Sequence, residues 1–312
     1  MTRILTFRDI IKLNISIDEI VDSVKDALVA HSKREVILQP KITLRPTDDT
    51  FYTAMPGGVK SWGYLGNKTI QRVAEQGDGP SVKGTMFLND QDTGNLLSVM
   101  DATWLTSMRT GAVAALTAKC FAKSDVKRIS IMGLGNTATA TLLFMSHLFP
   151  DLKEVTALDY KDHAERIKNR FPNLNFNFVQ DIEDLFCDSD VVITALTFAG
   201  EPFVKPEWLT EGMLAIPIHM RGWQNCDALF DKVFTDDHDH IKSWMPSVSG
   251  ELGSVINGSN KGRENDSEKI IAYNYGIAIN DIAIAKVIYQ TAVRENAGHD
   301  VNMDDLESKY YI

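Results

Sequence analysis

The sequence predicts an α/β protein with two domains, one a doubly wound parallel sheet and the other of mixed α+β composition. Three observations lead to this fold class. Apolar runs alternate with helical patterns through the middle of the chain, which is typical of parallel βαβ units. The first hundred residues instead hold successive strand-like runs separated by Gly, Pro and Asp turns. A length of 312 residues suits two hydrophobic cores better than one.

The N-terminal part begins with an amphipathic helix and continues as strands. Residues 16–32 carry apolar side chains at helical spacing. Four strand-like runs follow, namely KITLRP, TFYTAM, YLGNKTI and SVKGTMFLND. NDQDTG predicts a hairpin turn, and residues 101–122 predict a long helix that leads into the middle of the chain.

The middle of the chain alternates strands with helices. The strand-like runs are RISIM, EVTALDY, NFNFV, DVVITAL, MLAIPI and KVFTDD, with helix-like HAERIKNRF and DIEDLF among them. A last helix, GIAINDIAIAKVIYQTAVREN, has an apolar face that we expect to return to the first domain. Residues 1–115 with 279–312 are therefore predicted to form one domain, and residues 116–278 the other.

RISIMGLGNTA contains the main functional motif, because a strand passes through a glycine turn directly into a helix. In Gly133-x-Gly135-x-x-Ala138, the first glycine permits the tight turn and the second lets backbone amides approach a phosphate. Ala138 allows close packing of helix on strand. Asn136 and Thr137 provide first-turn amides at the positive end of the helix dipole. The pattern predicts a dinucleotide site in a Rossmann-type domain.

Asp159 follows the fingerprint at the end of the next apolar run, about 20 residues after Ala138, where an acid contacts the adenosine ribose. A carboxylate there repels a 2′-phosphate, so the sequence favours NAD over NADP. The competing interpretation is that Asp159 caps a helix beginning near His163.

The composition of the chain limits which binding partners and which cellular compartment are expected. The net charge of −10 argues against nucleic acid or an anionic membrane as the partner. The charged N-terminal segment predicts no signal peptide or membrane span. The three cysteines lack a pairing pattern, which indicates reduced thiols in the cytoplasm. The acidic and histidine-rich run at 236–240 is interpreted as a solvated loop, so no metal is expected.

The chain resembles the ornithine cyclodeaminase/mu-crystallin family over nearly its whole length. The resemblance lies in RTGAVAALTAKCFAKSDVKRISIMGLGNTA, with NDQDTG upstream and YGIAINDIAIAKVIYQTA downstream. It implies a homodimer that pairs through the non-Rossmann domain, which also binds substrate. Members include NAD-dependent lyases and dehydrogenases, and ketimine reductases that act on amino or imino acids.

The resemblance also implies roles for single residues. It assigns Arg109 and Thr110 to the cofactor, with Arg109 gripping the diphosphate, and Lys68 to the substrate. Ser81 matches a family threonine near the nicotinamide, and Asn274 a family serine near the nicotinamide amide. The residues alone favour a different interpretation, in which Arg109 lies on a helix surface and Lys68 is a solvated lysine on an open strand face.

A cation in QPKITLRP is expected to clamp the substrate carboxylate, and both Arg45 and Lys41 are candidates. We favour Arg45 because its planar guanidinium matches a carboxylate. Cations converging on one site in an acidic protein predict a small anionic amino or imino acid substrate.

The loop after MLAIPI departs from the cyclodeaminase pattern because it lacks the family aspartate. His219 is a candidate general acid/base, with a hydrogen-bonded structural histidine as the alternative, and Arg221 stands near the missing aspartate. HMRGW…VFTDDHDH looks more like the diaminopropionate-forming, opine-like branch of the family. Asp227 supplies a carboxylate only if the loop folds back. Thr194 and Thr197 are expected to line the nicotinamide pocket, with core packing as the alternative.

Together these residues predict an NAD-dependent oxidoreductase that transfers hydride at the α-carbon of an amino or imino acid. Two alternatives stay open. One is ornithine cyclodeaminase, which would convert ornithine to proline and ammonia. The other is a low-turnover nucleotide-binding protein like mu-crystallin.

Overall fold

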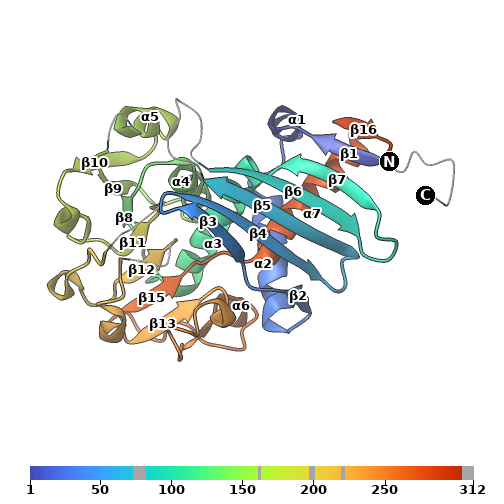
Figure 1. The fold of residues 1–312 in the computed structure, drawn as a ribbon. Helices are drawn as coiled ribbons and strands as arrows, with labels where there is room; N and C mark the ends of the chain where they lie inside the picture. Colours follow the sequence, from blue (N-terminus) through green and yellow to red (C-terminus); the bar gives the residue numbers. More distant parts are fainter. Residues whose placement is uncertain (73–81, 161–162, 197–200, 219–221, 304–312) are drawn as a thin grey trace. The chain divides into compact units, whose positions relative to one another are not determined.

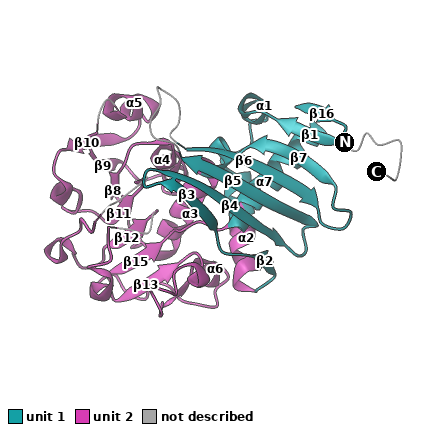
Figure 2. Ribbon diagram, in the orientation of Figure 1, with its two compact units in different colours: residues 1–23, 34–106, 278–312 teal, residues 24–33, 107–277 magenta. Residues whose placement is uncertain are grey.

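The structure is a computed structural model that describes residues 1–72, 82–160, 163–196, 201–218 and 222–303. Its contacts divide the chain into two compact units, which Figure 2 distinguishes by colour. Unit 1 comprises residues 1–23, 34–106 and 278–312, and unit 2 comprises residues 24–33 and 107–277. None of the helices in these described ranges is long and apolar enough to cross a membrane.

Unit 1 is built on a mixed sheet with the strand order β16-β1-β7-β6-β5-β4-β2, in which β3 pairs with β4. The strands are β1 (Thr2–Leu5), β2 (Val36–Leu38), β3 (Ile42–Thr47), β4 (Thr50–Val59), β5 (Tyr64–Arg72), β6 (Val82–Asp90), β7 (Leu96–Asp101) and β16 (His299–Val301). The pair β1–β7 is parallel and the other pairs are antiparallel.

One face of this sheet is covered by a single long helix. α7 (Ala278–Arg294) packs against β4, β5 and β6 and runs behind them in Figure 1, and its apolar residues are almost all buried. The short helix α1 (Phe7–Lys12) packs beside β1. β3 contains Pro46, which a strand tolerates where it pairs on one side only, and β3 pairs only with β4 among the described strands.

Unit 2 is built on a parallel sheet with the order β10-β9-β8-β11-β12-β15-β13-β14. Its strands are β8 (Arg128–Met132), β9 (Glu154–Leu158), β10 (Asn175–Val179), β11 (Val191–Thr194), β12 (Leu214–Pro217), β13 (Lys232–Thr235), β14 (Gly250–Glu251) and β15 (Ile270–Tyr273). All strand pairs in it are parallel. The first five follow the doubly wound order that the sequence predicts, so the fold class is confirmed.

The central strands of unit 2 consist of apolar residues, as expected for a parallel sheet that is covered on both faces. Every residue of β11, β12 and β15 is buried. The connecting helices are α4 (Asn136–Leu148), α5 (His163–Arg170) and α6 (Leu252–Ile256), with short 3₁₀ turns η1 (Ile182–Leu185), η2 (Pro206–Trp208), η3 (Asp227–Leu229) and η4 (His238–His240). DIEDLF, which the sequence predicts as a helix, forms only the 3₁₀ turn η1.

Two helices cross the division between the units. α2 (Ile17–Ser32) contributes its C-terminal half to unit 2, and α3 (Thr103–Phe121) divides after Thr106 rather than near residue 115. The end of α2 belongs to unit 2 because α6 approaches it closely. A Cβ on Gly253 would come within 2.0 Å of the carbonyl oxygen of Leu28. Sequence periodicity identifies α2 but carries no information about this contact.

Candidate functional site

The turn between β8 and α4 requires glycine at its first position. Gly133 has a φ of +95°, and a Cβ there would lie 2.5 Å from the carbonyl oxygen of Ala195. Ala195 follows β11, which pairs with β8, so the turn lies where the strand order reverses. Ligands of open α/β sheets bind at this switch point.

The N-terminus of α4 is open beside this turn. Gly135 precedes the helix, and a Cβ there would meet no described atom within 4 Å. Gly135 and Asn136 are exposed and Thr137 is half-buried, whereas Ala138 is fully buried against the sheet. The first-turn amides and the helix dipole therefore fit an anionic diphosphate.

Close packing of α3 on α4 explains the glycine of the Arg-Thr-Gly-Ala run. A Cβ on Gly111 would lie 2.6 Å from the carbonyl carbon of Ala140 in α4. A larger residue would separate the two helices. Thr110, the preceding residue, is buried in the same helix.

Asp159 directly follows β9, the strand beside β8. Its amide donates to the carbonyl oxygen of Val179 at 2.8 Å, and its carboxylate accepts from Nε2 of Gln180 at 2.9 Å. Both contacts come from the end of β10 and the residue that follows it, rather than from the first turn of α5. This placement fits the ribose-binding role better than a helix cap.

Arg109 lies against a glycine that sequence reasoning missed. Gly276 has a φ of +81°, and a Cβ there would lie 2.3 Å from Nη1 of Arg109. The amides of Tyr275 and Gly276 both donate to the carboxylate of Asp236, at 3.1 and 2.5 Å. Arg109 is only 6% exposed, so it is not an ordinary helix-surface arginine. The backbone at Gly276, which Asp236 holds, therefore lies against the guanidinium.

Thr194 and Asn274 are engaged within unit 2. The hydroxyl of Thr194 accepts from the indole nitrogen of Trp223 at 3.1 Å, and Thr194 is 1% exposed. The side-chain amide of Asn274 donates to Thr117 at 3.0 Å, while its backbone amide donates to Pro217. These contacts favour the core-packing interpretation of Thr194.

Lys68 lies in unit 1, on the face of the sheet that α7 covers. The register places it in one row with Met55, Met86 and Met100 across four strands. Its Nζ donates to Oδ1 of Asp281 in α7 at 2.7 Å, and both side chains are 0% exposed. Lys68 is therefore a buried, ion-paired ammonium rather than a solvated lysine on an open strand.

The structure places Arg45 away from this row. Arg45 is exposed in β3, with its guanidinium 5.8 Å from the ring centroid of Phe51. The register shifts between Leu44 and Thr47, so Arg45 has no assigned partner on β4. Ile42 pairs with Ala54, so Lys41, one residue earlier, lies beside the row of Met55 and Lys68. Of the two clamp candidates, the register favours Lys41.

Four predicted site residues lie outside the described residues, namely Ser81, Thr197, His219 and Arg221. Asp227 of η3 is described, and its Oδ1 accepts from the hydroxyl of Tyr273 at 2.5 Å. Burial raises the pKa of Asp227 and outweighs the opposite effect of this hydrogen bond. Its carboxylate is thus engaged with the core of unit 2, which weakens the proposal that it replaces the family aspartate.

Asp281, Asp236 and Gly276 are the site residues that sequence reasoning missed. A signal for Asp281 exists, because a single acid interrupts the apolar run AINDIAIA. Asp236 is the first acid after the strand run KVFT. The interpretation of 236–240 as a solvated loop is wrong for its first two acids, because Asp236 and Asp237 are 0% and 2% exposed. Gly276 precedes a helix like many glycines, so nothing local marks its contact with Arg109.

Comparisons with known proteins agree with this geometry. The model of the ornithine cyclodeaminase/mu-crystallin family matches residues 1–296. An alanine dehydrogenase of Archaeoglobus fulgidus is 31% identical, with 96% of this chain and 98% of that protein covered. The N-((2S)-2-amino-2-carboxyethyl)-L-glutamate dehydrogenase of Staphylococcus aureus is 28% identical, with 91% and 93% covered.

A solved structure gives the same result. An archaeal alanine dehydrogenase dimer with bound NAD superposes with a TM-score of 0.86 at 29% identity, covering 97% of this chain and 99% of that one. The similar identities of 31% and 28% do not separate the alanine dehydrogenase from the opine-like branch, so the closer kinship to that branch stays a prediction. The protein belongs to the ornithine cyclodeaminase/mu-crystallin family.

Proposed function

We propose that the protein is an NAD-dependent oxidoreductase that acts at the α-carbon of an amino or imino acid. The observation that carries this proposal is the glycine turn that opens onto the N-terminus of α4, with Asp159 at the end of the neighbouring strand. Relatives of the same family include an alanine dehydrogenase with bound NAD, 29% identical to this chain.

The residues of unit 2 fit the cofactor. Gly133 and the amides at Gly135, Asn136 and Thr137 bind the diphosphate, and Arg109 neutralises its charge with a guanidinium already held in place by Gly276. Asp159 accepts from the ribose hydroxyls and disfavours a 2′-phosphate. A bound NAD would supply the hydride acceptor for oxidation of an amino acid, and a bound NADH the hydride donor for the reverse reduction of an imino acid.

The residues of unit 1 fit the substrate carboxylate. Lys68 supplies a desolvated ammonium that Asp281 keeps oriented, and Lys41 or Arg45 supplies a second cation. Such charges orient the substrate so that its α-carbon meets the nicotinamide in a reactive geometry. Lys68 or His219 moves the proton of the substrate nitrogen. Arg221 pairs with an additional carboxylate of the substrate. Ser81 and Asn274 lie near the nicotinamide, as the family resemblance implies, Thr197 lines the same pocket, and Thr110 contacts the cofactor.

A panel of L-amino acids with NAD tests the proposal through the absorbance of NADH, and the reverse panel combines NADH with 2-oxo acids plus amines and with cyclic imino acids. Turnover in either direction is expected. Conversion of ornithine to proline and ammonia without net NADH would instead identify a cyclodeaminase. NADH binding without turnover of any compound would identify a carrier, and absence of NADH binding would refute all three functions.

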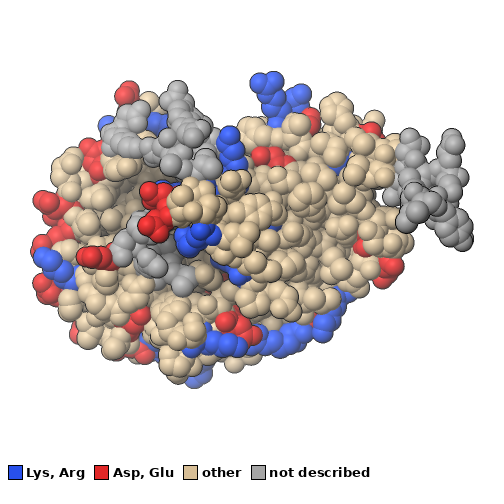
Figure 3. Space-filling view, viewed as in Figure 1, with Lys and Arg blue, Asp and Glu red and all other residues tan. Residues whose placement is uncertain are grey.

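We also propose that the protein is a homodimer that pairs through unit 1. Ile37, Ile42, Leu44 and Tyr52 are between 39% and 61% exposed, and the register puts them on the sheet face opposite Lys68. Figure 3 shows few charged side chains where Figure 1 draws β4 to β7. An alanine dehydrogenase neighbour is described as a dimer. Light scattering is expected to give twice the chain mass of 34.8 kDa, and Leu44→Asp is expected to give the monomer.

We place the protein in the cytoplasm on the basis of its thiols. Cys120, Cys187 and Cys226 are free, and Cys187 is exposed. Free thiols are retained in reducing compartments. Fractionation of the source cells tests this assignment.

A further inference from the structure

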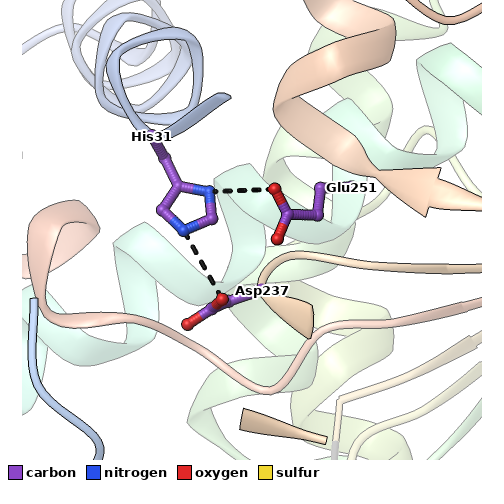
Figure 4. Close-up of side chains that lie close together, drawn as sticks. All are labelled: His31, Asp237 and Glu251. Carbon is purple, nitrogen blue, oxygen red and sulfur yellow. Dashed lines mark ion pairs between the residues drawn. The ribbon is translucent and has the colours of Figure 1, made fainter. Parts of the chain in front are cut away.

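A buried cluster of acids and histidines lies in unit 2 beside the segment that contacts Arg109. It joins the last turn of α2 to β14 and to the residues after β13. Nε2 of His31 lies 3.5 Å from Oδ1 of Asp237, and its Nδ1 lies 3.7 Å from Oε2 of Glu251. Figure 4 shows the ring between the two carboxylates. Nδ1 of His240 in η4 contacts the other oxygen of Asp237 at 2.5 Å.

The geometry of the cluster favours a positive charge on His31. A neutral imidazole carries one N–H, so in either tautomer a ring lone pair would face one of the two carboxylates. The ring and Asp237 are each 2% exposed, so water does not compensate a lone pair that faces Asp237, whereas the side chain of Glu251 is 11% exposed. The protonated ring directs an N–H toward each acid, at the ion-pair distances of 3.5 and 3.7 Å.

The other contacts of the acids agree with this assignment. The amide of Asp239 donates to Oδ1 of Asp237, and the amide of His238 donates to Oε1 of Glu251. Burial by itself raises the pKa of Asp237, but the hydrogen bonds and charge of His240 and His31 more than offset it and hold that pKa well below its usual range. α6, which packs against the same turn of α2, contributes no charged side chain.

Two contacts link the cluster to the cofactor residues. Asp236, next to Asp237, accepts from the amides of Tyr275 and Gly276, and Gly276 lies against the guanidinium of Arg109. The ring of His240 lies 5.5 Å from the ring of Tyr275, measured between centroids. A shift of Asp237 therefore displaces the backbone on which Arg109 rests.

We propose that His31 is a positioning residue for cofactor binding. Its protonated ring anchors Asp237 between α2 and β14, and Asp236 and Gly276 transmit this anchoring to Arg109. The inference rests on the proposed function. It predicts that loss of the proton from His31 loosens Arg109 and weakens the grip on the cofactor diphosphate.

The test measures the dissociation constant of NADH by fluorescence from about pH 6 to about pH 9, where a histidine can change charge. The wild-type constant is expected to rise roughly tenfold over this range, which is the effect of one hydrogen bond to a charged group. His31→Gln is expected to show the weaker binding at every pH. His299→Gln, at an exposed position of β16, is the matched control and should follow the wild type.

Parallel pH profiles of the wild type and His31→Gln would overturn the proposal, even if the variant melts at a lower temperature. Long-range ¹H–¹⁵N spectra of the ring give an independent readout, and both nitrogens of His31 are expected to carry hydrogen near neutral pH. Stoichiometric Zn²⁺ binding that His31→Gln abolishes would also overturn it, because one ring nitrogen would then serve an ion. If the wild type binds no NADH at any pH, the proposed function fails, while the ring spectra still decide the charge of His31.

Discussion

Replacement of Lys68 by Met should destabilise the fold strongly. The ammonium of Lys68 is the described partner of Asp281 at 2.7 Å, and neither side chain is exposed. Lys68→Met removes a cation from a buried carboxylate, which costs about 3–5 kcal/mol. For a chain of this size that loss lowers the melting temperature by on the order of 10 °C. Differential scanning calorimetry without ligand measures it.

Removing both charges should restore most of this stability. In the double variant Lys68→Met/Asp281→Leu, the row of methionines becomes continuous and neither charge of this pair stays buried. The matched control is Lys83→Met, an exposed lysine on the next strand, which should melt close to the wild type. A Lys68→Met variant that melts within about 2 °C of the wild type would refute the reasoning.

The double variant also separates stability from chemistry. Its NADH affinity should be close to that of the wild type, because Lys68 and Asp281 belong to unit 1, whereas the residues proposed to bind the diphosphate and the ribose belong to unit 2. Its turnover should be lost if the ammonium binds the substrate carboxylate. An unchanged kcat would assign Lys68 a purely structural role.

Three further predictions concern unit 2. Gly276→Ala and Gly258→Ala place alanine at similar positive φ angles, +81° and +79°, but only the Cβ at position 276 would contact Arg109. Gly276→Ala alone should therefore weaken NADH binding, by roughly tenfold in a fluorescence titration. Asp159→Ser should weaken NADH and strengthen NADPH binding, and an unchanged ratio of the two constants would contradict the ribose assignment. Because the folded pKa of Asp237 lies below the unfolded value, its carboxylate stabilises the fold above about pH 4 and loses this effect as pH falls further. Acid unfolding of Asp237→Asn should therefore depend less on pH than that of the wild type.

The part of the site that is local in sequence could be predicted from the sequence. The turn at Gly133, the open helix start at Gly135 and the acid at Asp159 follow from strand, turn and helix patterns within about 30 residues, the size of one βαβ unit. The parallel sheet follows from the same alternation. These features depend on neighbouring residues, so their spacing carries the information.

Contacts between distant residues could not be predicted in this way. Lys68 and Asp281 are 213 residues apart, and the pairing that buries both depends on which sheet face α7 covers. The same holds for Gly276 and Arg109, whose contact depends on how Asp236 holds the 274–276 backbone. Guanidinium chemistry favours Arg45 as the clamp, but the register shift in β3 separates it from the row of Lys68. A register is decided by whole strands rather than by one side chain.

In unit 1, N-terminal strands pair with C-terminal elements, and this affects how the nascent polypeptide folds. β1 pairs with β16, and β5 needs α7 to cover its buried face, so the first strands made wait for the last residues. Unit 2 is complete once residue 277 has left the ribosome. Before α7 is made, Asp281 is not yet present to pair with Lys68, and the methionine row is uncovered. A chain that stops before α7 therefore exposes an apolar sheet face to chaperones and proteases. Its unit 2, which carries the nucleotide-binding residues, is already complete.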